Sequence, residues 1–553
     1  MDFKDIHVVN STMELADCRD KWIFDDKYDC WCLEDVLYSP EADVPAFQRL
    51  SVYAPRAYMN ENGTVNPEGV CSGYTCATAP VLFETNAAGY MQMPHKWLGG
   101  PRCDGEKYLK RGMIYVTAGC RGRESRNEAG HPVGKAPISL IDTKMALRFL
   151  RHNRTALPGD WNKVISCGVS AGGAMSTLLG VTGDHPDYDA YLRAAGAFMD
   201  ESDAVFASQI NCPIIDLEHA DLAYEWCFAA DHTCEDSPAG PAETMTPFKE
   251  ALSKRLARRY IDYVNALQLK HPVTGEALTL NPDGRSGAFY DYLMNRLNES
   301  AAKFLRMKGE DAADYISGHY TYEVPAAPQQ AENPDLHHVG PGAGGPADNN
   351  LTVGEMMLRP PKGIPYHEMV MPMETRQGND KRAWLLWDGE KVSIRDLDIY
   401  VLNHRRRMKP CTSFDKLTND SGENDVFGDA NHANRHFDGQ IGEAIAELVA
   451  DYPGEAALYG SGYREIDEAL KERIRVLNPM NYIGDPAGRK AKAFRIRVGA
   501  SDADTAFTIS MTLAIRLANA GHDVDYALVW DQPHCDADYP GEVLDWIDGI
   551  CRS

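Results

Sequence analysis

A serine stands between glycines where a short apolar run gives way to small residues. The run 164–169 is followed by Ser170, with Gly168 and Gly172 two residues to either side. A strand that turns sharply into a helix can hold such a serine in a strained conformation with its hydroxyl exposed, and small neighbours avoid a collision there. The pattern predicts a nucleophile that could attack a carbonyl carbon. A glycine-rich turn without chemistry is the alternative on these five residues alone.

Two later loops carry the acid and the base that a serine nucleophile needs. Asp502 and Asp504 follow a predicted strand at 494–499, and His534 follows another at 524–530. The histidine would accept and return the serine proton, while one aspartate would fix the imidazole tautomer and balance its charge. Asp502 leaves its strand first and is the preferred acid, with Asp504 as the alternative. A lone loop histidine is more often structural, but the chain order serine, acid, histidine favours catalysis.

Backbone N–H groups near the serine would stabilise the negative oxygen that develops during acyl transfer. One donor is expected from Ala171, the residue after the nucleophile. The second is expected from the small-residue loop 85–90, which follows a predicted strand, with Ala88 as the preferred residue. An ordinary turn is the alternative interpretation of this loop.

The elements that position these residues alternate between strands and helices. Helices are predicted at 137–153, at 505–520 and from about 540, and strands at 50–54, 81–83 and 113–116 (the first of the sheet), 164–169, 194–199, 494–499 and 524–530. This order predicts an α/β protein with a mainly parallel central sheet flanked by helices. Together with the order of serine, acid and histidine, it indicates the α/β-hydrolase fold.

The pattern changes in the middle of the chain, where regular strand alternation stops until the 490s. Two amphipathic helices are predicted at 247–269 and 288–307, ahead of a Pro/Gly/Asn-rich tract at 324–350. This stretch predicts an inserted cap or lid, within which the tract would be a mobile loop, or alternatively a linker or disordered tail. The expected domains are residues 1–214 for the first part of the core, 215–425 for the cap and 426–553 for the second part of the core.

Composition limits the partners of the protein. The 553-residue chain carries a formal net charge of −25, and 44% of its residues are hydrophobic. Nucleic acids and anionic membranes require basic surface, so neither is an expected partner. The N-terminus lacks a basic segment followed by an apolar core, and no run of about 18 apolar residues occurs, which together predict a cytoplasmic protein. The oligomeric state stays open.

The fourteen cysteines do not indicate a disulfide scaffold, because they are sparse in a long chain. Reduced thiols are expected. Cys30 with Cys32, or Cys71 with Cys76, could ligate a metal, but no second pair with zinc-site spacing accompanies them. Neither a metal nor a cofactor is therefore expected.

Several segments taken together resemble a known family, the bacterial tannases (tannin acyl hydrolases) of the lactobacillus type. They are TNAAGYM from residue 85, CGVSAGGA around Ser170, RRRMKPCTSFD from 405, SGEND from 421, NPMNYI from 478, and RVGASDADT with WDQPHCDADY near the end. The resemblance implies a serine esterase that cleaves galloyl esters through an acyl-enzyme, with Ser170, Asp502 and His534 as its triad.

The resemblance also implies a site for the three adjacent hydroxyls of a galloyl ring, formed by Lys409, Glu423 and Asp504. Phenolic O–H groups can donate to two carboxylates, and an ammonium can donate to a phenolic oxygen. Without the resemblance, we would interpret Lys409 as a solvated lysine in a basic run and Glu423 as a turn residue.

The chain departs from related patterns at two places. Ala87 and Ala88 occupy the oxyanion loop where more glycine is expected. Fungal tannases and feruloyl esterases pair a cysteine directly before the serine with one after the histidine. Here Val169 precedes the serine although Cys535 follows the histidine, so that family fits less well. The alternatives to a galloyl esterase are a hydroxycinnamoyl or general aryl carboxylesterase, and a non-catalytic protein that binds phenolic ligands.

Overall fold

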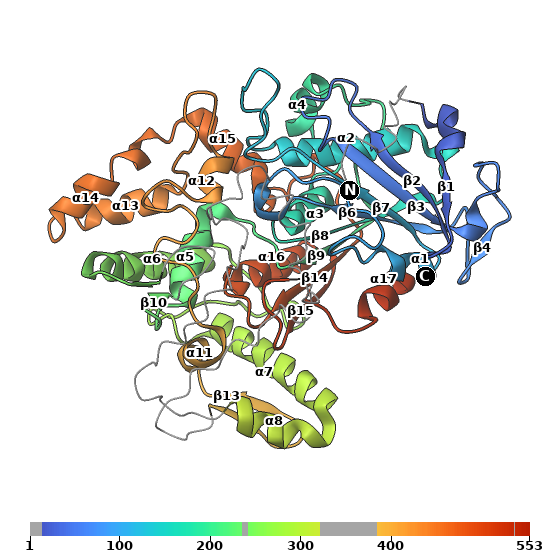
Figure 1. The fold of residues 1–553 in the computed structure, drawn as a ribbon. Coiled ribbons are helices and arrows are strands. Elements are labelled where there is room, and N and C mark those ends of the chain that lie inside the picture. The colour runs from blue at the N-terminus through green and yellow to red at the C-terminus, as the bar shows by residue number, and fades with distance from the viewer. Residues whose placement is uncertain (1–13, 235–241, 321–383, 536, 553) are drawn as a thin grey trace, which may run out of the picture.

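A nine-stranded sheet forms the centre of the computed structural model, which describes residues 14–234, 242–320, 384–535 and 537–552 (Figure 1). The strands, in spatial order, are β1 (Ile23–Asp25), β2 (Cys30–Leu37), β3 (Arg49–Pro55), β7 (Ile114–Ala118), β6 (Pro80–Thr85), β8 (Asp160–Val169), β9 (Ala207–Asn211), β14 (Ala493–Gly499) and β15 (Asp523–Val529). Neighbours pair antiparallel from β1 to β7 and parallel from β7 to β15. The predicted mainly parallel sheet is confirmed.

Helices cover both sides of this sheet. Helix α2 (Ile138–His152) lies on one side, and α1 (Gly105–Lys110) and α17 (Glu542–Arg552) lie on the other (Figure 1). Helix α3 (Ala171–Val181) contacts β8 and β9, and α16 (Phe507–Asn519) contacts β14 and β15. Strands β3, β7 and β14 are buried at every position, as strands covered on both faces require. The helices predicted at 137–153, at 505–520 and near 540 are confirmed.

The sheet begins earlier in the chain than predicted. Strands β1 and β2 precede β3, although 50–54 was expected to be the first strand. They form an antiparallel extension, and a register shift between Leu33 and Val36 interrupts the pairing of β2 with β3. This irregularity also breaks the alternation of buried and exposed residues by which a half-buried strand is recognised.

The run 194–199 is not the strand that its apolar residues predict. Helix α4 (Asp189–Ala194) occupies its start, and Gly196 then adopts a φ of 76°, which ends the helix at little cost because glycine has no Cβ. The strand beside β8 is β9, further along the chain. Its sequence is polar, and Ser208 Oγ lies 2.9 Å from Ser166 Oγ inside the sheet. Because these buried side chains are polar, β9 does not form the apolar run by which a buried strand is predicted from sequence.

A long excursion separates β9 from β14. Its main helices are α5 (Leu217–Cys227), α6 (Pro247–Ala266), α7 (Ala288–Lys308), α8 (Ala312–His319), α11 (Leu397–Tyr400), α12 (Gly422–Val426), α13 (Gly439–Glu447), α14 (Pro453–Tyr459) and α15 (Glu468–Leu477). The helices predicted at 247–269 and 288–307 are confirmed. Helix α7 packs along the edge strand β15, where Ser300 Oγ donates to the Leu528 carbonyl oxygen at 2.8 Å.

Short paired strands also occur outside the main sheet. They are β4 (Val70–Cys71) with β5 (Tyr74–Thr75), β10 (Thr233–Cys234) with β11 (Glu243–Thr244), and β12 (Leu385–Trp387) with β13 (Val392–Ile394). No strand was expected at any of these three pairs. The tract 324–350 lies outside the described residues. The domain divisions at 214/215 and 425/426 stay predictions, and α13 to α15 lie between the second boundary and β14.

None of the helices in the described ranges combines the length and the apolar character that crossing a bilayer requires. No disulfide joins any two of the fourteen cysteines, all of which lie within those ranges.

Candidate active site

Ser170 occupies the turn between β8 and α3 in the strained conformation that its glycine neighbours predict. Its φ is 61° and its ψ is −126°, outside the regions that L-residues prefer. A Cβ on Gly168 would lie 2.3 Å from the Gly172 carbonyl oxygen, and one on Gly172 would lie 2.7 Å from the Thr85 carbonyl oxygen. Only glycine therefore lets α3 approach the end of β6 this closely, and that approach fixes the serine.

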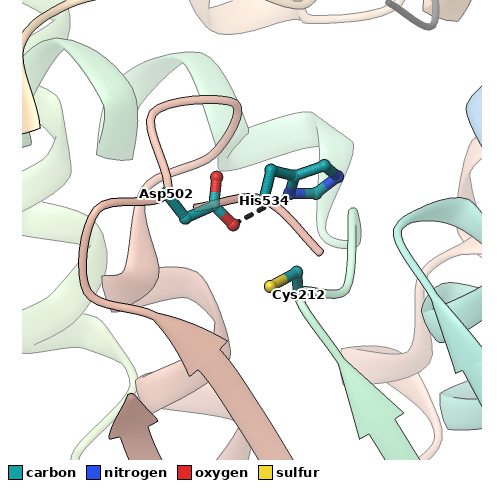
Figure 2. Close-up of side chains that lie close together, drawn as sticks. All are labelled: Cys212, Asp502 and His534. Carbon is teal, nitrogen blue, oxygen red and sulfur yellow. Dashed lines mark hydrogen bonds and ion pairs between the residues drawn. The ribbon is translucent and has the colours of Figure 1, made fainter. Parts of the chain in front are cut away.

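Three side chains from different strand ends form one hydrogen-bonded line. Ser170 Oγ lies 2.9 Å from His534 Nε2, and His534 Nδ1 lies 2.8 Å from Asp502 Oδ2. Figure 2 shows the histidine ring facing the aspartate. Of the two candidate acids, Asp502 is the one that bonds the ring. Asp504 instead donates its backbone N–H to Asp502 Oδ1 at 2.9 Å. The structure thus brings together the three residues that the sequence selected.

The charges of these residues are coupled. Burial alone would lower the pKa of His534, but the charges of Asp502 and Asp504 and the hydrogen bond to Asp502 raise it well above its ordinary value. Burial would raise the pKa of Asp502, yet the charge and hydrogen bond of His534, with the charge of Arg405, hold it below its ordinary value. An ionised Asp502 can therefore balance an imidazolium on His534.

A segment of the long excursion holds the acid loop from outside the sheet. It is η8 (Val401–Arg405), a π-helical turn that directly follows α11. The guanidinium of Arg405 donates to the backbone carbonyls of Asp502 and Thr505, and His404 Nε2 lies 3.0 Å from Ser501 Oγ. Arg405 is fully buried although three consecutive arginines ordinarily indicate exposed charge. Sequence reasoning missed both residues, because their partners lie about a hundred positions away.

A cysteine also contacts the triad. Cys212 directly follows β9, is fully buried, and lies within hydrogen-bonding reach of His534 (Figure 2). Burial and the charge of Asp502 raise the pKa of its thiol to about 11, although His534 acts in the opposite direction. The strand was predicted at 194–199 and not at β9, which ends at Asn211, so Cys212 was missed. Its position directly after a strand beside the serine strand is the signal that could have found it.

The backbone around the serine offers the expected donors. Ala171 is the first residue of α3, so its N–H has no acceptor within that helix. The loop after β6 enters the 3₁₀ turn η4 (Ala88–Tyr90), and a Cβ on Gly172 would lie 3.6 Å from the Ala87 nitrogen. Thr85 Oγ1 donates to the Gly172 carbonyl oxygen at 2.7 Å and so ties the loop to the serine turn. The roles of Ala171 and Ala88 stay predictions.

Two of the three residues expected at the galloyl ring lie together. Lys409 Nζ is 3.9 Å from Asp504 Oδ1 and 4.1 Å from the centre of the Phe414 ring. Glu423 belongs to α12, which packs against η4. Burial chiefly raises the pKa of Tyr90 in that turn, and the Glu423 charge adds to the effect. Within the described residues, no ion pair joins Glu423 to the other two.

Comparison with solved structures identifies relatives along nearly the whole chain. The native structure of tannin acyl hydrolase from Lactobacillus plantarum is 30% identical, with 94% of each chain covered and a TM-score of 0.72. Tannase from Fusobacterium nucleatum is 27% identical, with 94% of this chain and 95% of that chain covered and a TM-score of 0.71. The chain belongs to the tannin acyl hydrolase (tannase) family.

A family model points to the same class of enzyme. The model BD-FAE, an α/β-hydrolase family, matches residues 109–219, which include Ser170 and Cys212. A comparison with curated proteins found no match. The predicted family and the α/β-hydrolase fold are confirmed, and this member of the tannase family is a carboxylic ester hydrolase. That result sets aside the alternative of a non-catalytic binding protein.

Proposed function

We propose that this tannase-family enzyme hydrolyses galloyl esters and releases gallic acid. The observation that carries the proposal is the position of Asp504, two residues beyond the carboxylate that bonds His534 and 3.9 Å from the Lys409 ammonium. The two residues proposed to bind the ring thus adjoin the hydrogen-bonded line. Solved structures of tannin acyl hydrolase in complex with ethyl gallate, 29% identical over 94% of each chain with a TM-score of 0.70, and in complex with 3,4-dihydroxybenzoate support a phenolic acyl group.

In the acylation step, Ser170 Oγ attacks the ester carbonyl carbon while His534 Nε2 accepts the serine proton. Asp502 holds the ring with Nδ1–H toward it and balances the imidazolium. The carbonyl oxygen becomes an oxyanion, which the N–H groups of Ala171 and Ala88 would stabilise. The C–O bond to the alcohol then breaks as His534 returns the proton to the leaving oxygen, which leaves an acyl-serine.

In the second step, water replaces the alcohol. His534 takes a proton from a water molecule while the water oxygen attacks the acyl carbon. His534 then donates this proton to Ser170 Oγ as the acyl-enzyme bond breaks. Gallate leaves, and the enzyme is restored. The raised pKa of His534 favours its acceptance of a proton from serine or water, and the low pKa of Asp502 keeps the compensating charge in place.

Recognition of the ring follows from hydrogen-bond chemistry. Asp504 and Glu423 would accept phenolic O–H groups, and Lys409 would donate to a phenolic oxygen. A substrate without these hydroxyls leaves each buried partner unpaired, at a cost of about 1–3 kcal/mol per group. A site built in this way can reject the analogue by about 10⁴-fold or more, which an apolar slot cannot do.

The test compares kcat/KM of the purified enzyme on methyl gallate, methyl ferulate, methyl benzoate and p-nitrophenyl acetate. Methyl gallate should be cleaved far faster than methyl benzoate, and methyl ferulate should also be poor because a methoxy group replaces one donor and a second hydroxyl is missing. Glu423→Ala should reduce the difference in kcat/KM between methyl gallate and the other two methyl esters. Ser170→Ala should lose about a thousandfold or more on every ester while it keeps its fold.

Comparable kcat/KM for methyl ferulate and methyl gallate would overturn the galloyl preference and favour the broader aryl carboxylesterase. Near-normal turnover by Ser170→Ala would overturn the assignment of the nucleophile. The two results are independent, since the first concerns the ring and the second the reacting carbonyl.

A further inference from the structure

Cys212 contributes a donor atom to the triad that ester hydrolysis does not use. It leaves β9, Asp502 leaves β14 and His534 leaves β15, and these three strands are consecutive neighbours in the sheet. Parallel strands end at one edge, so the three side chains converge there. One ligand atom from each, the cysteine Sγ, a carboxylate oxygen and a ring nitrogen, lies within 4.8 Å of the other two (Figure 2).

This donor set is one that zinc prefers. A thiolate, an imidazole and a carboxylate bind Zn²⁺ at about 2.3, 2.0 and 2.0–2.2 Å, so ligand atoms in a tetrahedral site lie about 3.3–3.8 Å apart. The three ligand atoms would have to move by at most about one ångström to reach these separations from their positions in the structure. The charges also suit a dication in a buried place, because a thiolate and a carboxylate together neutralise it. Water would complete the fourth position.

We propose that Cys212, Asp502 and His534 form an inhibitory site for Zn²⁺, whose occupation turns off ester hydrolysis. The loss of hydrolysis rests on the proposed roles of Ser170 and His534, whereas binding of the metal does not.

The protons account for the inhibition. On binding, the Cys212 thiol releases one proton to solvent and the sulfur bonds the metal. His534 Nδ1, which donates its hydrogen to Asp502 at 2.8 Å in the hydrogen-bonded triad, offers its lone pair to the metal. The imidazole keeps one proton, which now resides on Nε2. That nitrogen, 2.9 Å from Ser170 Oγ, then donates to the serine and cannot accept its proton.

The site is tested on the full chain with Zn²⁺ and with Cd²⁺, whose bond to a thiolate gives an ultraviolet charge-transfer band. Hydrolysis of p-nitrophenyl acetate is measured against added ZnCl₂, and each protein is compared with its own metal-free rate. The wild-type enzyme should lose activity, recover it with EDTA, and show a Cd²⁺–thiolate band to which Cys212 contributes. In Cys212→Ser that contribution should be lost and inhibition should need at least about a hundredfold more Zn²⁺, since even indirect partners of a metal site change affinity by 10–100-fold.

Cys535→Ser is the matched control. This cysteine adjoins His534 in the chain and its Sγ lies 3.8 Å from Gln532 Oε1, but it does not belong to the donor cluster. It should keep wild-type sensitivity to Zn²⁺. Far-UV circular dichroism checks the fold of each variant, and Cys212→Ala provides a second replacement if the serine variant is unstable.

Equal Zn²⁺ inhibition of wild-type enzyme and of Cys212→Ser or Cys212→Ala would overturn the site, as would a Cd²⁺–thiolate band of the same intensity with and without Cys212. A band that depends on Cys212 but leaves hydrolysis unaffected would support the metal site, overturn its inhibitory role, and count against His534 as the base. Failure of the site is thereby distinguished from failure of the proposed mechanism.

Discussion

At the scale of single residues, two carboxylates act on His534, the proposed base, in different ways. Asp502 bonds the ring directly, whereas Asp504 acts on His534 through its charge and also faces Lys409. One loop therefore tunes the proton acceptor and contacts the proposed substrate ring. Because both effects come from Asp504, they can be separated with an ester that lacks phenolic hydroxyls.

Replacement of Asp504 by Asn should move the acid limb of the pH profile to lower pH. His534 accepts the serine proton only when neutral, so kcat/KM rises as the pH passes the His534 pKa from below. Asp504 is one of the charges that raise this pKa, and its removal lets the pKa fall toward its ordinary value. The measurement is kcat/KM on p-nitrophenyl acetate across pH, with EDTA present.

Asp504→Glu is the control for this experiment, because it keeps the charge and should retain the wild-type acid limb. A limb that stays in place in Asp504→Asn would show that this carboxylate does not act on His534.

At the scale of elements, the turn η8 acts as a clamp on the acid loop. It ends at Arg405, whose guanidinium lies 4.0 Å from the Phe507 ring centre and donates to two carbonyls around Asp502. Arg406 follows with a φ of 49°, which turns the chain away. A single π-helical turn of this kind often marks a functional position in a helix. Here it lets one short element fix the loop that bears Asp502.

Arg405→Lys should reduce kcat on every ester, on the order of 10²-fold, with little change in KM for p-nitrophenyl acetate. Lysine keeps the charge but lacks the planar fork that reaches both carbonyls, and a displacement of about 1 Å in a catalytic group can cost this much. Steady-state kinetics on p-nitrophenyl acetate and on methyl gallate supply the measurement.

Arg406→Lys is the matched comparison, since Arg406 bonds Asp231 at 3.2 Å rather than the acid loop. Its kcat should stay close to the wild-type value. If Arg405→Lys also kept wild-type kcat, the acid loop would not depend on the clamp.

At the scale of the whole molecule, the residues between β9 and β14 are anchored by buried charge. The Glu225 carboxylate of α5 accepts hydrogen bonds from both Nη atoms of Arg407, at 2.9 and 2.6 Å, and from Ser253 Oγ of α6 at 2.6 Å. Both charged side chains are almost completely buried. The pair joins two helices to the segment that carries Arg405 and Lys409, so stability of this region and order at the site are linked.

Glu225→Ala should destabilise the protein by about 3–5 kcal/mol, because it leaves the Arg407 guanidinium buried without its partner. Urea unfolding followed by circular dichroism measures the change. The exposed pair of Glu468 and Lys471 on α15 provides the contrast, and Glu468→Ala should change stability little. Similar losses in the two variants would show that the buried pair does not anchor the region.

Local pattern was enough to predict many of the elements and the outline of the site. The glycines around Ser170 indicate a strained turn because a side chain at these positions would collide with the backbone, and the whole pattern lies within five residues. Helices α2, α6, α7 and α16 reveal themselves by a period of about 3.6 residues, which reports one buried face. The order of serine, acid and histidine follows from the order of strands along the chain, and sequence displays that order directly.

Only the tertiary structure decided which of these residues meet. The sequence favoured Asp502 over Asp504 as the acid, but the structure alone shows that Asp502 bonds His534, that Cys212 joins them, and that Arg405 clamps the loop. Strand β9 is polar yet buried, so no local period marks it. The physical reason is the same in each case: hydrophobic patterning records how much of a residue is covered, whereas the partner of a buried polar group depends on the tertiary arrangement. That arrangement brings together residues 32, 97 and 364 positions apart at this site.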